Sequence, residues 1–345
     1  MTVSSNVNAP SAALPVLAAD SREGVLKLDE ELTLHFGGSL PAVEIAWRIV
    51  SPAGAPIVVA VGGISAGRYV TASPDTKGWW SSIVGDGLAL NTQRFQVLGM
   101  DFLGGSGTTT GPKPNERFPA ISAYDQATIL ARLLAHLKID QVHAIVGASY
   151  GGMVALAFAE RFAERVEHII SISAADRSHP MSTAWRSVQR SIVRYALDKQ
   201  DGAEGLRLAR ALAMATYRSS QEFEKRFAGP PKLVDGRYYF PVEQYLLARG
   251  DAYATTYKPE AFVCLSESID LHQVDARSIN VPTTLVAVRE DQLVPLADMQ
   301  ALKERMGSRA ELIEISSLYG HDAFLKEADA LRHAFARVLN VGANR

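Results

Sequence analysis

Residues 142–153 constrain the fold of this chain more than any other stretch. An apolar, β-branched run ends at Gly147, the chain turns through Ser149, and an apolar helical run begins at Met153. Gly-x-Ser-x-Gly between a strand and a helix is typical of a nucleophile elbow, in which a sharp turn exposes the serine hydroxyl. Gly147 and Gly151 stand where such a turn leaves no room for a side chain. A glycine turn with an incidental serine is the alternative.

The composition is that of an ordinary soluble globular protein. Of the 345 residues, 47% are hydrophobic and 21% are charged, and this length predicts one large α/β domain with a substantial insertion. The net charge of -2 argues against a nucleic-acid or anionic-membrane partner. Cys264 is the single cysteine and follows apolar residues. We therefore expect a buried structural thiol, with neither an intrachain disulfide nor a multi-cysteine metal site.

The amino-terminal residues and the apolar runs bear on the compartment. No apolar segment reaches the roughly 18 residues that a membrane span needs. Residues 1–22 contain mostly Ser, Ala, Pro and Val near their start and lack a basic segment there, so we expect a flexible tail rather than a signal peptide. These features predict a cytoplasmic protein.

Strands and helices alternate along most of the chain. Residues 57–61 form a continuous apolar run, which is typical of a strand covered on both faces, and further strands are predicted at 95–100, 142–147, 168–173, 282–288 and 311–315. Helical spacing at 124–137 and 329–339 adds to a βαβ rhythm, which predicts a mainly parallel sheet flanked by helices. Shorter segments with period-two alternation predict antiparallel strands at the edge of that sheet. They are residues 26–28, 32–34 and 43–47.

The alternation of strands and helices stops in residues 177–274, which we call the helical insertion. No buried strand is predicted there, only helices at 185–197, 206–217, 221–227, 242–253 and 259–269. Gly229-Pro230-Pro231 and Asp235-Gly236 predict turns between them. So long a helical segment between strands of one sheet indicates a lid. The predicted core comprises residues 23–176 and 275–345.

Ionisable side chains follow the last two predicted strands. Glu290 and Asp291 come after one strand, and His321 comes after the next. The chain order Ser149, Asp291, His321 is that of α/β-hydrolase-type enzymes, and each residue stands at a carboxyl end, where doubly wound sheets bind ligands. His321 would take the Ser149 proton, and Asp291 would orient the imidazole. Glu290 is the competing acid, and we prefer Asp291.

The loop after the first long apolar strand is placed to complete an oxyanion hole. It is the glycine-rich segment 62–67. The backbone N–H of Ile64 and that of Tyr150 would bracket the carbonyl oxygen. Loss of one such donor costs about 3 kcal/mol of barrier.

Several further motifs carry a more specific signal. They are Gly78-Trp79-Trp80 with Gly85, Gly87, Leu90 and Arg94-Phe95; Leu103-Gly104-Gly105 with Ser106-Gly107-Thr108-Thr109 and Gly111-Pro112; Gly151-Gly152-Met153; Gly205-Leu206 with Ala209-Arg210 and Thr216-Tyr217-Arg218; and Gly320-His321-Asp322-Ala323-Phe324-Leu325. Together they resemble the homoserine O-acyltransferase family of the α/β-hydrolase fold. The resemblance covers nearly all of residues 43–325.

The resemblance implies roles for five residues. Ser149 would be the nucleophile, Asp291 and His321 would complete its triad, and Arg210 and Asp322 would bind substrate. A guanidinium suits the carboxylate of zwitterionic homoserine, and a carboxylate suits its ammonium group. Without the resemblance, Arg210 would be a solvated arginine and Asp322 a turn cap. The family also implies a homodimer formed through the insertion.

Two departures from the family pattern lie beside the expected oxyanion hole. The acetyltransferases carry a loop resembling His-Ala-Leu-Thr-Gly-Asp, where this chain has Gly62-Gly63-Ile64-Ser65-Ala66-Gly67 and then Arg68. Tyr150 stands where many members have methionine. We therefore expect specificity to depend on Gly63, Ser65 and Ala66. A succinyl group ends in a carboxylate and needs a cation, for which Arg68 and Arg177 are candidates, and we favour succinyl over acetyl.

The expected reaction is ping-pong acyl transfer from acyl-CoA, a co-substrate, to the hydroxyl of L-homoserine in methionine biosynthesis. We expect no other cofactor and no metal. The insertion would exclude water from the acyl-enzyme. The alternatives are succinyl transfer to serine in cysteine biosynthesis, an esterase or thioesterase with the same triad, and a non-catalytic binding protein.

Overall fold

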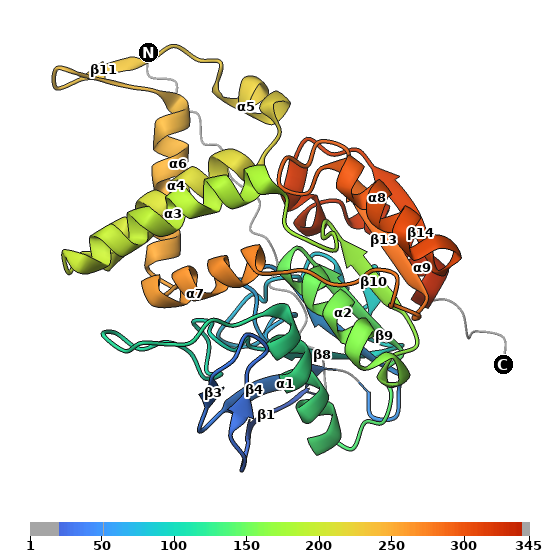
Figure 1. Ribbon diagram of the computed structural model, residues 1–345. Coiled ribbons are helices and arrows are strands. Elements are labelled where there is room, and N and C mark those ends of the chain that lie inside the picture. The colour runs from blue at the N-terminus through green and yellow to red at the C-terminus, as the bar shows by residue number, and fades with distance from the viewer. Residues whose placement is uncertain (1–20, 51, 340–345) are drawn as a thin grey trace.

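An eight-stranded sheet forms the centre of the computed structural model, which describes residues 21–50 and 52–339 (Figure 1). Its strands follow the order β1 (Ser21–Lys27), β4 (Glu44–Val50), β8 (Gln96–Met100), β5 (Ile57–Val61), β9 (Ala144–Ala148), β10 (Ile169–Ile172), β13 (Thr283–Val288) and β14 (Ala310–Ile315). β4 pairs antiparallel with both β1 and β8, and the other pairs are parallel. The predicted mainly parallel sheet is confirmed.

Successive residues of the central strands alternate between two buried faces. In β5, Val59 and Val61 pack on the side of α1 (Ala123–His136), α2 (Tyr150–Arg161) and α8 (Leu296–Met306). Val58 and Ala60 pack on the other side, with Trp80 and α9 (Ala328–Leu339). Because helices or loops cover both faces, most positions of these strands are apolar.

The amino-terminal strands differ from the prediction. β4 is an internal strand rather than an edge strand, and its polar-looking Arg48 is buried, with the guanidinium donating to the carbonyl oxygens of Thr71 and Ala72 at 3.2 Å each. β2 (Leu32–Thr33) pairs only with β3 (Ser39–Leu40), outside the main sheet. β1 begins at Ser21, so the last two residues assigned to the tail belong to a strand. Residues 1–20 lie outside the described residues.

The helical insertion contains five helices. They are α3 (Pro180–Asp198), α4 (Gly202–Tyr217), α5 (Ser220–Phe227), α6 (Pro241–Ala254) and α7 (Pro259–Asp270). The expectation of helices alone was wrong in one place, since an exposed hairpin joins α5 to α6, formed by β11 (Lys232–Val234) and β12 (Arg237–Tyr239). Its turn is Asp235-Gly236, and both residues have positive φ, 48° and 79°, as a two-residue hairpin turn requires.

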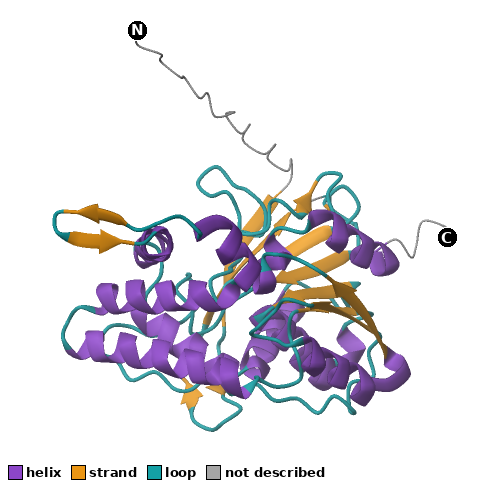
Figure 2. Ribbon diagram, turned by 90° about the horizontal axis from the view of Figure 1, so that it is seen from above, coloured by secondary structure: helices purple, strands orange, loops and turns teal. Residues whose placement is uncertain are grey.

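The insertion is a distinct layer of helices beside the sheet (Figures 1 and 2). α3 packs against α4 and α7, and α4 packs against α6. Its two ends lie side by side: Arg177 forms an antiparallel bridge with Gln273, and Val274 N–H donates to Asp176 O at 2.9 Å. Among the described residues, no helix is long and apolar enough to cross a membrane.

The remaining elements are short. They are β6 (Val84–Gly85), which pairs with β7 (Leu90–Asn91), and the 3₁₀ helices η1 (Ala163–Arg165), η2 (Gly307–Arg309) and η3 (Gly320–Leu325). The last of these follows β14 and holds two of the predicted site residues, His321 and Asp322.

Candidate active site

Ser149 occupies a sharp turn between β9 and α2. Its backbone has φ 55° and ψ −124°, a conformation that is strained for any residue except glycine and that clusters at functional sites. A Cβ atom on Gly147 would lie 2.2 Å from the carbonyl oxygen of Gly151, and one on Gly151 would lie 2.2 Å from that of Val61. Both positions therefore require glycine, as the sequence predicted.

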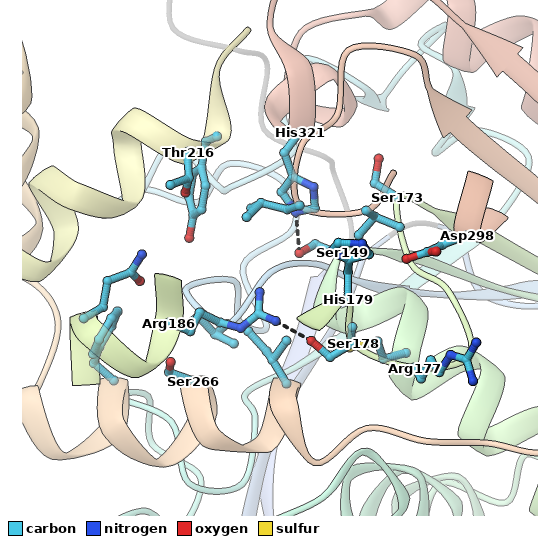
Figure 3. A pocket seen from close by; sticks show the side chains of 18 residues that line it. Ser149, Ser173, Arg177, Ser178, His179, Arg186, Thr216, Ser266, Asp298 and His321 are labelled. Carbon is cyan, nitrogen blue, oxygen red and sulfur yellow. Dashed lines mark hydrogen bonds between the residues drawn. The ribbon is translucent and has the colours of Figure 1, made fainter. Parts of the chain in front are cut away.

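The three residues predicted to form a triad lie in one hydrogen-bonded chain. His321 Nε2 is 2.8 Å from Ser149 Oγ, shown as a dashed line in Figure 3, and His321 Nδ1 is 2.7 Å from Asp291 Oδ2. Asp291 Oδ1 accepts from the backbone N–H groups of Leu293 and Val294, at 2.8 and 3.0 Å. These bonds fix the carboxylate, which in turn fixes the imidazole. This is the arrangement of a Ser-His-Asp triad.

Glu290 is excluded as the partner of His321 by its own contacts. Its carboxylate accepts from the backbone N–H of Ser317 at 2.8 Å and from the hydroxyl of Ser316 at 2.5 Å. The side chain is therefore turned toward the end of β14 and away from the imidazole, which leaves Asp291 as the acid.

The environment of His321 tunes its basicity. Burial lowers the pKa of this imidazole, but the Asp291 carboxylate raises it by more, so the pKa stands above its usual 6.5. His321 is thus a stronger base than a free imidazole. Cys264 shows the opposite case. It is partly buried in α7, and burial raises the pKa of its thiol to about 12, so the thiol is not activated as a nucleophile.

The loop of residues 62–67 lies against the elbow. Gly151 N–H donates to Gly62 O at 2.8 Å, which fixes the start of the loop beside Ser149. Neither the N–H of Ile64 nor that of Tyr150 donates to another group of the described residues. Two backbone donors are thus available next to the serine, as an oxyanion hole needs.

Two cavities meet at the serine. Both are lined by Ser149, His321 and Ile64. The Arg210 cavity, named for its basic residue, also contains Gly63, Ser65, Ala66 and Asp322. The Arg186 cavity lies on the side of α3 and α7 and is also lined by Arg177, Arg186 and Asp298. One reacting hydroxyl can therefore be reached from two chemically different pockets.

Arg210 and Asp322 face this site as predicted, and each is held by neighbours. The Arg210 guanidinium lies over the rings of Tyr217 and Tyr253, 5.1 and 4.6 Å from their centroids. Burial lowers the pKa of Arg210, while the two tyrosines and Asp322 raise it to a value above the usual one. Asp322 Oδ2 lies 3.1 Å from Nη2 of Arg218. Arg210 is thus no solvated surface arginine, and its guanidinium and the Asp322 carboxylate lie on the wall of one cavity.

The two arginines proposed for an acyl carboxylate are placed less favourably. Arg68 is paired with Asp101, donates to Thr108 Oγ1 at 3.0 Å, and lines neither of the two cavities. Arg177 lines the Arg186 cavity, but its guanidinium points away from Ser149 (Figure 3).

Arg186, which the sequence analysis missed, is the better placed cation. It lines the same cavity as Ser149, where its guanidinium donates to the hydroxyl of Ser178, shown as a dashed line in Figure 3. The sequence contains a pattern that could have identified Arg186. Ser182, Arg186, Gln189 and Val193 follow helical spacing, and apart from Arg186 these are buried positions of α3. An arginine on the inward face of a helix needs a partner or a ligand.

Comparison with known proteins agrees with this geometry. Residues 56–328 match the family model described as the alpha/beta hydrolase fold. A homoserine O-succinyltransferase of Xanthomonas campestris pv. campestris is 43% identical over 293 residues, which are 84% of this chain and 77% of that protein. The chain belongs to the homoserine O-acyltransferase family.

Other members and neighbours of the family are more distant. A serine O-succinyltransferase of Emericella nidulans is 34% identical to this chain over 269 residues, 70% of this chain and 52% of that protein. The crystal structure of a homoserine O-acetyltransferase from Bacillus anthracis has a TM-score of 0.82 and is 18% identical, covering 93% of this chain and 98% of that one. At this identity the likeness shows the fold alone.

Proposed function

We propose that this acyltransferase moves a succinyl group from succinyl-CoA to the hydroxyl of L-homoserine, through an ester on Ser149. One observation carries the proposal: Ser149 and His321 lie where two cavities meet, and the cavities offer binding groups for two different substrates. A hydrolase of neutral esters needs no such pair of ionic groups.

In the first half-reaction Ser149 Oγ bonds to the thioester carbonyl carbon and its proton passes to His321 Nε2. The carbonyl oxygen becomes an oxyanion between the N–H groups of Ile64 and Tyr150. The carbon–sulfur bond then breaks, and His321 returns the proton to the leaving thiolate of CoA. Asp291 stabilises the imidazolium that forms in between.

In the second half-reaction His321 takes the proton of the homoserine hydroxyl, and the hydroxyl oxygen attacks the acyl carbon. The ester bond to Ser149 breaks, and its oxygen recovers the proton. Arg210 would pair with the carboxylate of the amino acid and Asp322 with its ammonium group. These charges orient the hydroxyl toward Ser149, which gives the amino acid its advantage over water.

The succinyl preference rests on the charges around Arg186. Asp270 pairs with two arginines, at 2.7 Å from Arg186 Nη2 and 2.5 Å from Arg190 Nη1. Burial raises the pKa of Asp270, but the arginines lower it by more, so this carboxylate is ionised. Two guanidinium groups and one carboxylate leave one positive charge in excess. The distal carboxylate of a succinyl group would neutralise it, whereas an acetyl group would not.

Steady-state turnover tests this proposal with acetyl-CoA and succinyl-CoA, each against L-homoserine and L-serine. We expect the highest kcat/KM for the pair of succinyl-CoA and homoserine. Release of free CoA at a rate independent of either amino acid would identify a thioesterase instead. Higher turnover with serine than with homoserine would make the protein a serine acyltransferase.

A further inference from the structure

Ile64 and Tyr150, whose backbone N–H groups would form the oxyanion hole, are each hydrogen-bonded to the helical insertion. The bonds use the carbonyl oxygen of Ile64 and the side-chain hydroxyl of Tyr150. The hydroxyl of Tyr257 donates to the carbonyl oxygen of Ile64 at 2.7 Å. The hydroxyl of Tyr150 is 2.6 Å from Ser268 Oγ. Tyr257 lies between α6 and α7, and Ser268 lies on α7. The two donors therefore belong to core residues, but a side chain of the insertion holds each of these residues in place.

Tyr257 acts on the loop and not on the reaction cavities. It lines neither of the two cavities that contain Ser149, but a separate one on the far side of the loop with Ser65 and Gly67. Its ring stacks on that of Tyr253, with centroids 4.9 Å apart and planes at 20°. The hydroxyl of Tyr253 is 3.0 Å from Ser65 Oγ. Two adjacent residues of the loop are thus fixed by two stacked phenols.

Tyr150 forms the corresponding anchor for the elbow. Its side chain is 1% exposed and packs edge-to-face against Phe102, with centroids 5.0 Å apart. It lines neither of the two cavities at Ser149, because the ring is directed at α7, where Ser268 is fully buried. Because the Tyr150 ring contacts α7, it does not fill either of the two cavities at Ser149. The side chain joins the residue after the nucleophile to the insertion.

We propose that the helical insertion sets the geometry of the oxyanion hole, with Tyr257 and the Tyr150–Ser268 pair as positioning residues. The inference rests on the proposed function, since it assumes that Ser149 is the nucleophile. An oxyanion donor must lie about 2.7–3.1 Å from the charged oxygen, and misplacement by about 1 Å can cost about 100-fold in rate. A peptide group in a glycine-rich loop reaches that accuracy only if its neighbours are fixed.

The test is the rate at which a small alkyl fluorophosphonate labels Ser149. In this reaction Ser149 Oγ bonds to phosphorus, fluoride leaves, the serine proton passes to His321, and the phosphoryl oxygen occupies the oxyanion hole. No acyl acceptor or CoA is involved, so neither substrate site contributes. The variants are Tyr257→Phe and Tyr150→Phe, which keep the rings and lose only the hydroxyls, and Ser268→Ala, which removes the second bond from its other end.

Tyr124→Phe is the matched control. The hydroxyl of Tyr124 donates to Glu160 between α1 and α2, so this change also removes one tyrosine hydrogen bond, but within the core. We expect labelling to slow by about tenfold in Tyr257→Phe, Tyr150→Phe and Ser268→Ala, and by less than about twofold in the control. Thermal denaturation should show small losses in all four, since each variant loses one hydroxyl group that forms hydrogen bonds.

Three outcomes would overturn the proposal. Labelling at the wild-type rate in the Tyr257 and Tyr150 variants, whatever their thermal stability, would show that the insertion does not position the donors. Equal slowing in Tyr124→Phe would show a general effect of lost stability. Labelling that persists in Ser149→Ala would show that Ser149 is not the nucleophile. The proposed function would then fail together with this inference.

Discussion

The core and the helical insertion hold their polar groups in different ways. In the core, Ser149, Asp291 and His321 follow three parallel strands of one sheet, β9, β13 and β14, and each takes part in one chain of hydrogen bonds. In the insertion, Arg186 and Arg210 project from helices that pack mainly on each other. The core thus fixes the three groups that we propose react with the acyl ester. The insertion supplies the charges that would choose between substrates.

Ser149→Ala tests the core part of this contrast and should have the largest effect. Removal of the nucleophile prevents the acyl-enzyme, so transfer should fall by about 10⁵-fold or more with both acyl donors. The fold should persist, because the side chain makes no hydrogen bond other than that with His321 among the described residues. Mass spectrometry of the intact protein after incubation with acyl-CoA, together with circular dichroism, checks both points. An acylated variant would refute the assignment.

Asp291→Asn should have the next largest effect, a fall in kcat of about 10⁴-fold for both donors, because the asparagine no longer holds or stabilises the charged imidazole. Glu290→Gln is the control, one residue away and bonded only to the end of β14. It should change kcat by less than about threefold. If the two variants lost activity equally, the acid would be misassigned.

Arg186→Met tests the insertion and should change the balance between donors. We expect kcat/KM for succinyl-CoA to fall by about 100-fold and that for acetyl-CoA to stay within about threefold, because only the succinyl group loses a charged partner. Arg194→Met, an exposed position on the same helix, is the control and should change neither value. Equal losses with both donors would mean that Arg186 serves the fold rather than the choice of acyl group.

The pH dependence should depend on the core alone. The serine can give up its proton only to neutral His321, so the rate of acylation should rise with pH through the pKa of that residue. Because Asp291 raises this pKa, the midpoint should lie above 6.5, with about a tenfold change per pH unit below it. Acylation rates with acetyl-CoA and succinyl-CoA should give one midpoint. Different midpoints would show that the insertion also contributes a titrating group.

The sequence predicted the parts of the protein that local rules determine. Apolar runs covered on both faces gave the parallel strands, and the spacing of glycine and serine gave the elbow with its two obligatory glycines. Asp291 and His321 followed from chain order. In the insertion, the five helices were predicted to within a few residues, except that α3 and α4 begin earlier than expected.

What the sequence did not predict depends on contacts between distant residues. The alternation at residues 43–47 predicted an edge strand that ends before Arg48, because nothing local shows that carbonyl groups of Thr71 and Ala72 receive the guanidinium of Arg48. Arg68 was one of two candidates to bind the acyl carboxylate, but Asp101, which follows β8, forms an ion pair with it. Helical spacing places Arg186 beside the buried residues of α3, but which cavity that face lines depends on how α3 packs against α7 and the elbow.

The adjacent ends of the insertion bear on how such a protein changes over evolutionary time. Since Arg177 and Gln273 lie bridged side by side, a short connection would close the core without disturbing any strand. The insertion can therefore be exchanged as a cassette while the triad stays in register, provided that its replacement again holds Ile64 and Tyr150 in place. A lineage that keeps one elbow can in this way acquire a new acceptor or revert to the use of water.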